Sequence, residues 1–114
     1  MNVEVFRDFC LSFPGAWEGM PFKGFFKNSR AILVFYVGEK MFCLFDLNAF
    51  DRCTLKCDPQ LIDELREREG IHKPFNLSSK HWIGVDLNGS VPWKMVQALT
   101  ATSYQLVSAS ISKK

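Results

Sequence analysis

Residues 31–47 read AILVFYVGEKMFCLFDL, and this stretch contains the pattern that decides the fold. Two runs rich in β-branched and aromatic residues, 31–37 and 40–47, flank the dipeptide Gly38-Glu39. Such runs are typical of β-strands, and glycine at the first central position suits a two-residue type II′ turn, whose twist matches that of a hairpin. The stretch therefore predicts an antiparallel β-hairpin.

A third strand is predicted for residues 52–56, which would extend the hairpin into a meander. The chain contains four cysteines, Cys10, Cys43, Cys53 and Cys57. Because Cys53 and Cys57 alternate with Leu55, the three would share one face of this strand. Free cysteine is among the residues most often buried, and a reducing cytoplasm keeps thiols reduced. We therefore expect the cysteines as buried thiols.

Helices are predicted before and after this meander from their capping residues. Asn2 can cap a first helix, which Pro14-Gly15 would end. Asp58-Pro59 suits the start of a second helix, because Asp accepts hydrogen bonds from first-turn amides and Pro loses nothing at the first helical position. Gly70 would stop it. Its expected buried stripe is Leu61, Ile62 and Leu65.

The C-terminal part predicts two more extended segments and a last helix. Residues 71–77 contain Pro74 and are expected as an edge strand or a loop. Residues 80–87 predict a strand, Asn88-Gly89 a turn, and Pro92 the start of a third helix. The apolar stripe expected on that helix is Met95, Val96, Leu99, Ser103, Leu106 and Val107. Its small residues Thr102 and Ser103 would let it lie close to a sheet.

The predicted order is therefore α-β-β-β-α-β-β-α, with residues 16–30 as a long loop that can contain a short strand. Strands linked by hairpins imply an antiparallel β-sheet, and we expect the helices to pack on one face of it, which is the α+β class. A chain of 114 residues fits one domain, residues 1–114.

Net charge and hydropathy bear on the partners and the location of the protein. The net charge of +2 neither supports nor excludes a nucleic-acid partner, since a near-neutral domain can segregate its charges. The first residues show no basic stretch followed by an apolar run, and the longest strongly apolar run is 31–37. We therefore expect a cytoplasmic protein without a membrane partner, and a monomer.

No pattern in the chain is typical of a catalytic or metal centre. The two histidines, His72 and His81, lack the context of a catalytic triad. Gly15, Gly19 and Gly24 lack the strand and helix that a phosphate loop requires. Cys53 and Cys57 lack a second ligand pair for zinc. We expect no enzymatic activity, no cofactor and no obligate metal.

Taken together, the segments resemble the MmcQ/YjbR family of small bacterial proteins over nearly the whole chain. The resemblance is carried by residues 13–15, Glu18, Pro21-Phe22, the hairpin 34–42, and residues 55–59, 80–82, 85–87, 89–92 and 103–107. It implies a fold like that of the bacterial frataxin homologue CyaY, and a DNA-binding protein with a double-wing arrangement. Two positions depart from the family pattern: Tyr36, where many relatives carry a basic residue, and Glu39, where many carry a second glycine.

The DNA-binding hypothesis requires a basic surface on or beside the strands. The candidate residues are Lys40, Arg52, Lys56, Lys73, Lys80 and His81. Phosphate contacts from such side chains would give a salt-sensitive affinity that tolerates any sequence. Trp82 would then be a base-stacking platform. The alternative is that these are ordinary solvated charges and that Trp82 is a packing residue.

A second hypothesis is a protein- or small-ligand-binding module that uses the aromatic loop 17–26. Its aromatic residues are Trp17, Phe22, Phe25 and Phe26. Exposed, they would form an apolar patch of the kind that marks an interaction site; buried, they would close one end of the core. Iron binding of the frataxin kind needs a dense acidic ridge, and the first helix offers only Glu4 and Asp8. We therefore expect no iron site.

Overall fold

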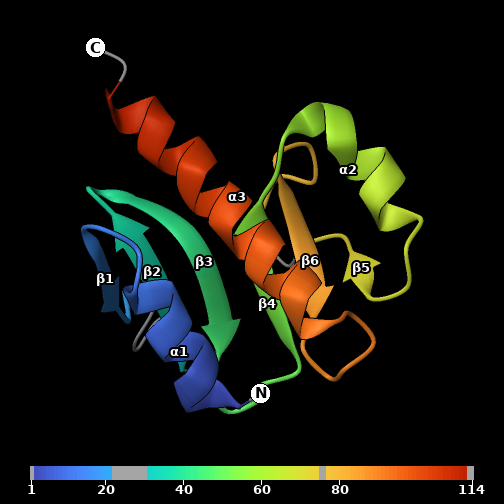
Figure 1. Cartoon of the computed structure of the whole chain (residues 1–114), viewed down its shortest axis with the longest axis horizontal. Coiled ribbons are helices and arrows are strands. Elements are labelled where there is room, and N and C mark those ends of the chain that lie inside the picture. The colour runs from blue at the N-terminus through green and yellow to red at the C-terminus, as the bar shows by residue number, and fades with distance from the viewer. Residues whose placement is uncertain (1, 22–30, 75–76, 113–114) are drawn as a thin grey trace.

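A six-stranded antiparallel sheet runs through the computed structural model of this chain, and helices pack against it (Figure 1). The structure describes residues 2–21, 31–74 and 77–112. The strands are β1 (Ala16–Gly19), β2 (Ile32–Val37), β3 (Lys40–Asp46), β4 (Arg52–Lys56), β5 (Ile71–His72) and β6 (Trp82–Asp86). The helices are α1 (Val3–Leu11), α2 (Pro59–Arg66) and α3 (Trp93–Ser112). In the sheet the strands follow the order β1-β2-β3-β4-β6-β5.

The predicted α+β class is confirmed, but the predicted order is one strand short. The missing strand is β1, which pairs with β2 along its whole length at the start of the expected loop. Its polarity is inverted: Glu18 faces the helices, where Arg7 of α1 binds its carboxylate, and Trp17 faces away from them. A charged residue facing inward and an aromatic residue facing outward do not give the usual strand signature.

The predicted hairpin is confirmed, and it carries a β-bulge. Gly38 has a φ of 61° at the turn between β2 and β3. Phe35 pairs with Cys43 but Tyr36 pairs with Met41, so Phe42 is the extra residue. Because a bulge breaks the strict alternation of sides, Phe42 and Cys43 are both fully buried.

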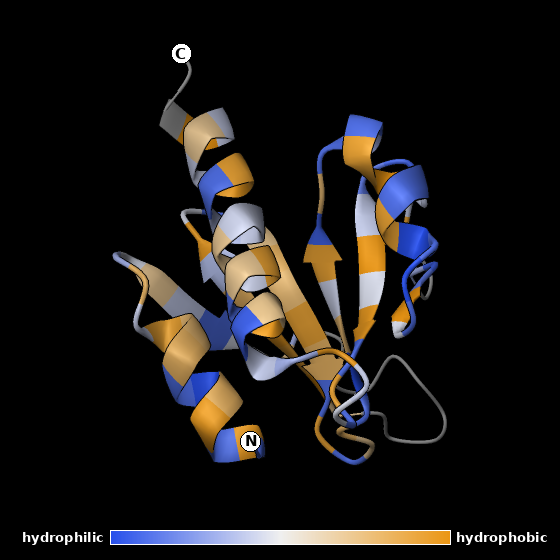
Figure 2. Cartoon of the chain, turned by 45° about the vertical axis from the view of Figure 1, so that its right-hand side comes forward, coloured by the Kyte–Doolittle hydropathy of each residue, from blue (hydrophilic) through white to orange (hydrophobic). Residues whose placement is uncertain are grey.

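The core lies between the sheet and the helices (Figure 2). Phe6 and Cys10 of α1 and Val96 and Val107 of α3 reach it from above the strands, and Ile62 of α2 joins the same buried cluster. The four cysteines are free and buried, as predicted. Burial, and then contacts with the thiols of Cys10 and Cys53, raise the pKa of Cys43 well above its usual value.

The helix caps follow the sequence closely, and the helix ends less so. The side chains of Asn2 and Asp58 accept hydrogen bonds from first-turn amides of α1 and α2, as predicted. However, α1 ends at Leu11, before Pro14-Gly15, and α2 ends at Arg66, before Gly70.

The prediction that Leu61 belongs to the buried stripe of α2 is wrong, since 45 % of this residue is exposed. Residues 71–77 were expected as an edge strand or a loop, and Ile71–His72 form the two-residue edge strand β5. The strand expected over residues 80–87 is shorter, because Lys80 and His81 lie in the turn that leads into β6. Asn88 supports the next turn by accepting hydrogen bonds from the amide and hydroxyl of Ser90.

The close approach of α3 to the sheet is confirmed, and Ser103 makes it possible. The direct β3–β4 ladder ends at the pair Cys43–Leu55. Just beyond it, the Ser103 hydroxyl donates to the Phe42 carbonyl at 2.5 Å and accepts from the Lys56 amide at 2.8 Å. A helix side chain therefore replaces a ladder hydrogen bond between β3 and β4. The sheet consists of two halves, β1–β2–β3 and β4–β6–β5, joined over three residue pairs.

In the part of the chain that the structure describes, no helix is long and apolar enough to cross a membrane.

Candidate nucleic-acid interface

The face of the sheet away from the helices carries most of the polar side chains of the strands, and we call it the open face. Its members follow from the strand registers and the alternation of sides. In the first half they include Trp17, Tyr36, Met41 and Leu44. In the second half they include Arg52, Lys56, His72, Trp82, Gly84 and Asp86.

The basic residues predicted for DNA do not form one surface, and Lys40 lies apart from the others. It begins β3 at the hairpin tip, where its Nζ is 3.3 Å from the hydroxyl of Ser110 on α3. Its side chain is thus directed to the helix side of the sheet. The expectation failed here because Lys40 is one residue from the turn, where position along the sequence does not fix the side.

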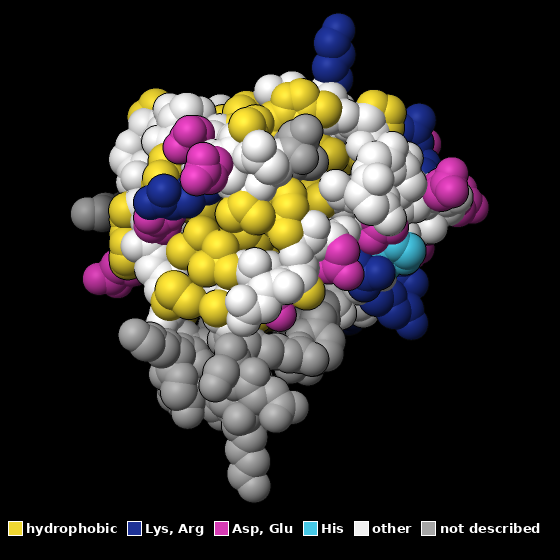
Figure 3. Space-filling view, turned by 90° about the horizontal axis from the view of Figure 1, so that it is seen from below, with side chains coloured by type: hydrophobic (Ala, Val, Ile, Leu, Met, Phe, Trp, Pro, Cys, Tyr) yellow, Lys and Arg dark blue, Asp and Glu magenta, His cyan; other side chains and the backbone are white. Residues whose placement is uncertain are grey.

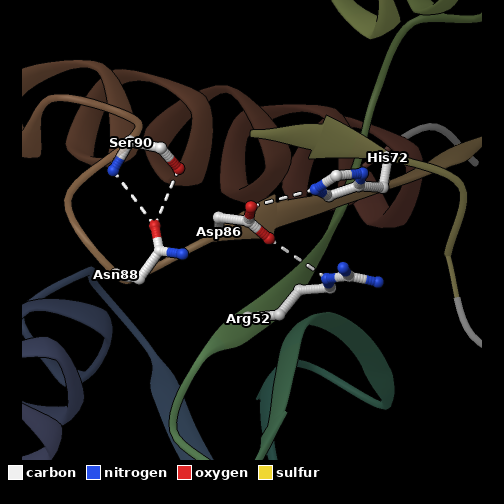
Figure 4. A network of polar contacts seen from close by, with 5 residues as sticks. All are labelled: Arg52, His72, Asp86, Asn88 and Ser90. Atoms are coloured by element: carbon white, nitrogen blue, oxygen red, sulfur yellow. Dashed lines mark hydrogen bonds and ion pairs between the residues drawn. The ribbon is translucent and has the colours of Figure 1, made fainter. Parts of the chain in front are cut away.

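Arg52 does lie on the open face, but it is engaged by a carboxylate (Figure 4). Its Nε is 3.3 Å from Asp86, and the other oxygen of Asp86 is 3.0 Å from Nε2 of His72. The three side chains come from β4, β6 and β5, which the sheet order brings side by side. Arg52 and His72 are more than two-fifths exposed, whereas Asp86 is mostly covered.

The pKa of Asp86 reflects this position. Burial alone would raise it, but the hydrogen bond and charge of His72, followed by those of Arg52, outweigh burial and leave the pKa below its ordinary value. Asp86 is therefore ionised at neutral pH. Its negative charge partly neutralises the basic residues beside it, which weakens this part of the face as a phosphate contact.

The absence of a side chain at Gly84 lets the side chain of Arg52 approach the backbone of Lys73. A Cβ atom built on Gly84 would lie 3.1 Å from Cδ of Arg52 and 3.1 Å from the carbonyl oxygen of Lys73. The side chain of Arg52 therefore crosses the sheet over Gly84, toward the backbone that follows β5. A larger residue at this position would push the guanidinium away.

The remaining basic residues gather where β4 ends and β6 begins. The Cys57 amide donates to the carbonyl of His81 at 2.8 Å, which joins the chain after Lys56 to the turn that holds Lys80 and His81. Between this turn and α2 lies a pocket of about 290 Å³. Its lining is Pro59, Ile62, Asp63, Arg66, Ser79, Lys80 and His81.

This arrangement adds Arg66 to the predicted residues. We call Lys56, Arg66, Lys80 and His81 the basic end. Three of them are candidates from the sequence, whereas Arg66 is not, because it lies in a helix and the hypothesis concerned residues on or beside strands. Its place in the last turn of α2, beside the start of β6, is a tertiary feature that no local pattern carries.

Trp82 is a packing residue and not an open stacking platform. It is 9 % exposed, and the Nζ of Lys56 lies 5.9 Å from the centroid of its ring. A buried ring next to an ammonium group stabilises the position of that group but offers no free face to a base. The stacking interpretation of Trp82 is therefore wrong for this structure.

An exposed aromatic pair occurs instead on the first half of the sheet. Trp17 stacks on Tyr36 with ring centroids 4.2 Å apart and an interplanar angle of 17°. Its indole N–H donates to the carbonyl of Gly38 at 2.9 Å, and 48 % of the residue is exposed. The other aromatic residues of the predicted loop, Phe22, Phe25 and Phe26, lie outside the described residues.

The end of the molecule opposite the basic end is apolar at its centre (Figure 3). A shallow hollow of about 310 Å³ there is lined by Leu87, Asn88, Gly89, Val91 and Trp93. Charged side chains lie around this apolar centre and not within it. The two ends of the domain therefore differ in chemistry.

The described residues contain no group of three or more His, Cys, Asp or Glu side chains that could hold a metal ion. His72 is paired with a carboxylate, as in a catalytic dyad, but within residues 2–21, 31–74 and 77–112 no hydroxyl or thiol hydrogen-bonds to its ring. The geometry of His72 is that of an ion-pair network.

Comparison with known proteins gives one family. The model of the YjbR family matches residues 11–106. The uncharacterized protein YjbR of Escherichia coli K12 is 25 % identical over 107 residues, covering 92 % of this chain and 86 % of that protein.

Solved structures agree with this result. The crystal structure of Deinococcus radiodurans protein DR2400, whose domain is described as DUF419, superposes with a TM-score of 0.81 at 34 % identity. The superposition covers 93 % of this chain and 78 % of the Deinococcus radiodurans chain. A crystal structure from Pseudomonas syringae gives a TM-score of 0.77 at 26 % identity, covering 94 % and 99 % of the two chains.

Proposed function

This chain belongs to the YjbR family, and from that premise we propose that it binds DNA through phosphate contacts made by the basic end. The observation that carries the proposal is that Arg66, Lys80 and His81 line one pocket, while Lys56 pairs with Trp82, the residue that follows His81. The protein acts in this proposal by binding alone, as a monomer, without a cofactor or a metal.

The surroundings of the basic end support phosphate binding. Lys80 and His81 are exposed, and Lys56 is held against the Trp82 ring, so its ammonium group loses little freedom on binding. One acidic side chain, Asp63, also lines the pocket between α2 and the turn and partly offsets this positive charge. Lysine and arginine contacts to phosphate fix a protein on DNA without reading its sequence. We therefore expect weak sequence preference and strong dependence on salt.

The test measures binding to a fluorescently labelled random-sequence duplex by anisotropy over a series of salt concentrations. We expect the logarithm of the association constant to fall linearly with the logarithm of the salt concentration. In the double variant Lys56→Ala, Lys80→Ala, two lost phosphate contacts should reduce that slope by about 1.8, since each contact contributes about 0.9.

The control is the double variant Lys40→Ala, Lys94→Ala, which loses the same charge from the hairpin tip and the start of α3. It should keep most of the affinity and the slope. Equal losses in the two double variants would mean that net charge alone matters and that the basic end is not the contact. No binding at low salt would overturn the proposal.

A second candidate function, small-ligand binding, rests on a groove of about 350 Å³ on the open face. Its floor includes Ile32, Leu44 and Thr54, and its rim carries Asp46, Asp51 and Arg52. An apolar floor with a few polar groups is typical of ligand sites of this size. A screen of small cationic aromatic compounds by thermal shift would test it. Hits should disappear in Leu44→Phe, which narrows the groove.

A further inference from the structure

We propose that Trp17 is a stacking platform for an unpaired nucleobase, and that the preferred ligand is single-stranded DNA. This inference rests on the proposed function, because it takes the phosphate contacts of the basic end as given. The stacked pair Trp17–Tyr36 and the sheet that presents it carry the argument.

The first step is the exposure of Trp17. A tryptophan on a sheet face normally gains stability by covering its ring, yet 48 % of Trp17 remains in solvent on the edge strand β1. Met20, just beyond β1, is also exposed. Tryptophan is enriched among the residues that dominate binding energy, because a large rigid ring is covered on binding at low entropic cost.

The second step is that the ring is already fixed in place. One face of the indole lies against Tyr36, and the indole N–H is bonded to the Gly38 carbonyl at the hairpin turn. A side chain held by both contacts has lost its rotational freedom in folding, so a ligand that stacks on it does not have to order it. An indole fixed in this way suits a flat partner.

The third step is the position of the pair relative to the basic charges. Tyr36 pairs with Met41, two residues before Cys43, and Lys56 follows Leu55, the partner of Cys43. Trp17 and Lys56 thus lie on the open face at the same end of the sheet. With strands about 4.8 Å apart, β1 and β4 are separated by about 14 Å. A strand of a few nucleotides spans that distance.

The fourth step is the choice of ligand. Proteins that bind single strands combine a positive surface, which follows the phosphates, with aromatic side chains on which bases stack. In a duplex the faces of the bases are stacked on one another, so Trp17 reaches only an unpaired base. Among described aromatic rings, Trp17 is the one with a large exposed fraction, so it is the residue that discriminates between the two forms.

The experiment compares a labelled oligothymidylate of about 12 nucleotides, within the usual site size, with a duplex of equal length. We expect tighter binding of the single strand. Trp17→Ala should weaken single-strand binding by roughly 5- to 150-fold, the value of one base–aromatic stack, and leave duplex binding unchanged. Trp17→Phe, which keeps a ring, should lose less.

Two further measurements secure the interpretation. Leu61→Ala and Val5→Ala remove side chains of similar exposure, 45 % and 44 %, from helices, and should have no effect. In the unsubstituted protein, the single strand should quench tryptophan fluorescence, and this quenching should be lost in Trp17→Ala. Because Trp82 and Trp93 remain in that variant, its loss of quenching assigns the signal to Trp17. Absence of quenching in the unsubstituted protein would overturn the inference without any variant.

The outcomes separate the two proposals. If neither DNA form binds at low salt, the proposed function fails and this inference fails with it. If the duplex binds through Lys56 and Lys80 but the single strand gains nothing, or causes no quenching, the proposed function stands and the stacking role of Trp17 is overturned.

Discussion

The two halves of the sheet share one helical cover but display different chemistry on the open face. The half β1–β2–β3 presents Trp17, Tyr36 and Met41 there. The half β4–β6–β5 presents Arg52, Lys56, His72 and Asp86. The helix side is mostly apolar across both halves, apart from Glu18 and Lys40 in the first half. The contrast indicates that the core required one pattern of all strands, while each half of the open face was left free for a separate role.

The joint between the halves is as informative as the halves themselves. Only three residue pairs connect β3 to β4, and Ser103 bridges the strands where those pairs end. A hydroxyl that both donates to one strand and accepts from the other satisfies two buried backbone groups at once. The joint between the two halves is therefore held by these three residue pairs and by one side chain of α3.

The most direct way to break the comparison is Ser103→Ala. It leaves the Phe42 carbonyl and the Lys56 amide without their partner, and each unsatisfied buried group costs about 1–3 kcal/mol. We expect the free energy of unfolding to fall by about 2–4 kcal/mol, measured by urea denaturation. Thr102→Ala, at the exposed neighbouring position, should change it by less than about 0.5 kcal/mol. A loss below about 1 kcal/mol for Ser103→Ala would mean that the bridge is not needed.

Alanine substitution of one glycine in each half compares how tightly the backbone of the two halves is packed. Gly70, before β5, has a φ of 88°, and a Cβ there would lie 2.5 Å from Cγ2 of Val91. Gly15, before β1, has a φ of 73° with nothing within 4 Å of a Cβ. Left-handed backbone costs about 1–2 kcal/mol for alanine, so Gly15→Ala should lose about that much. Gly70→Ala should lose about 1–3 kcal/mol more, because of overpacking. Equal losses in thermal unfolding would contradict the crowding at Gly70.

Much of the fold could be predicted because its signals are local. The hairpin 31–47 carries its turn glycine between two β-rich runs, and Asn2 and Asp58 carry the caps of their helices. A short strand was allowed for within residues 16–30, but the place of β1 could not be predicted, since the inward side chain Glu18 is neutralised by Arg7 from another element. A polarity pattern that depends on a tertiary ion pair is invisible in a window of sequence.

The candidate site was less predictable, because it depends on which side of the sheet each residue occupies. Lys56 and Lys80 were named correctly as neighbours of the strands, but Lys40 turned to the helix side and Arg52 to a carboxylate. Tyr36 was noted only as a lost charge. In the structure it is the ring on which Trp17 stacks, a role that depends on the register of β1 against β2.

The contribution of the second half of the sheet to DNA binding can be tested by removing one negative charge from it. Asp86→Asn frees Arg52 and removes a negative charge from the second half, so we expect duplex affinity at low salt to rise by a factor of about 2–10, or about 0.4–1.4 kcal/mol. Asp8→Asn makes the same change in net charge on α1. Anisotropy should show little gain for this control. Equal gains would indicate that DNA senses only the total charge of the protein.

The smallest expected effect is the pH dependence of stability that comes from the carboxylate ion pair in each half. The Arg7 hydrogen bond lowers the pKa of Glu18, and Asp86 also has a lowered pKa, through His72 and Arg52 against the opposing effect of burial. A carboxylate with a lowered folded-state pKa stabilises the protein above its ordinary value, about 4, and this contribution is lost as the pH falls through the lowered pKa. The free energy of unfolding should therefore fall less between neutral pH and a pH of about 3 in Glu18→Gln, and in Asp86→Asn, than in the parent. The difference from the parent should be less than about 1 kcal/mol for each variant, because both pairs are partly solvated. Urea denaturation at the two pH values measures the difference, with Glu69→Gln as an exposed control. If Asp86→Asn alone had an effect, the second half would carry the acid sensitivity of the whole sheet, and the Arg7–Glu18 pair would only position β1.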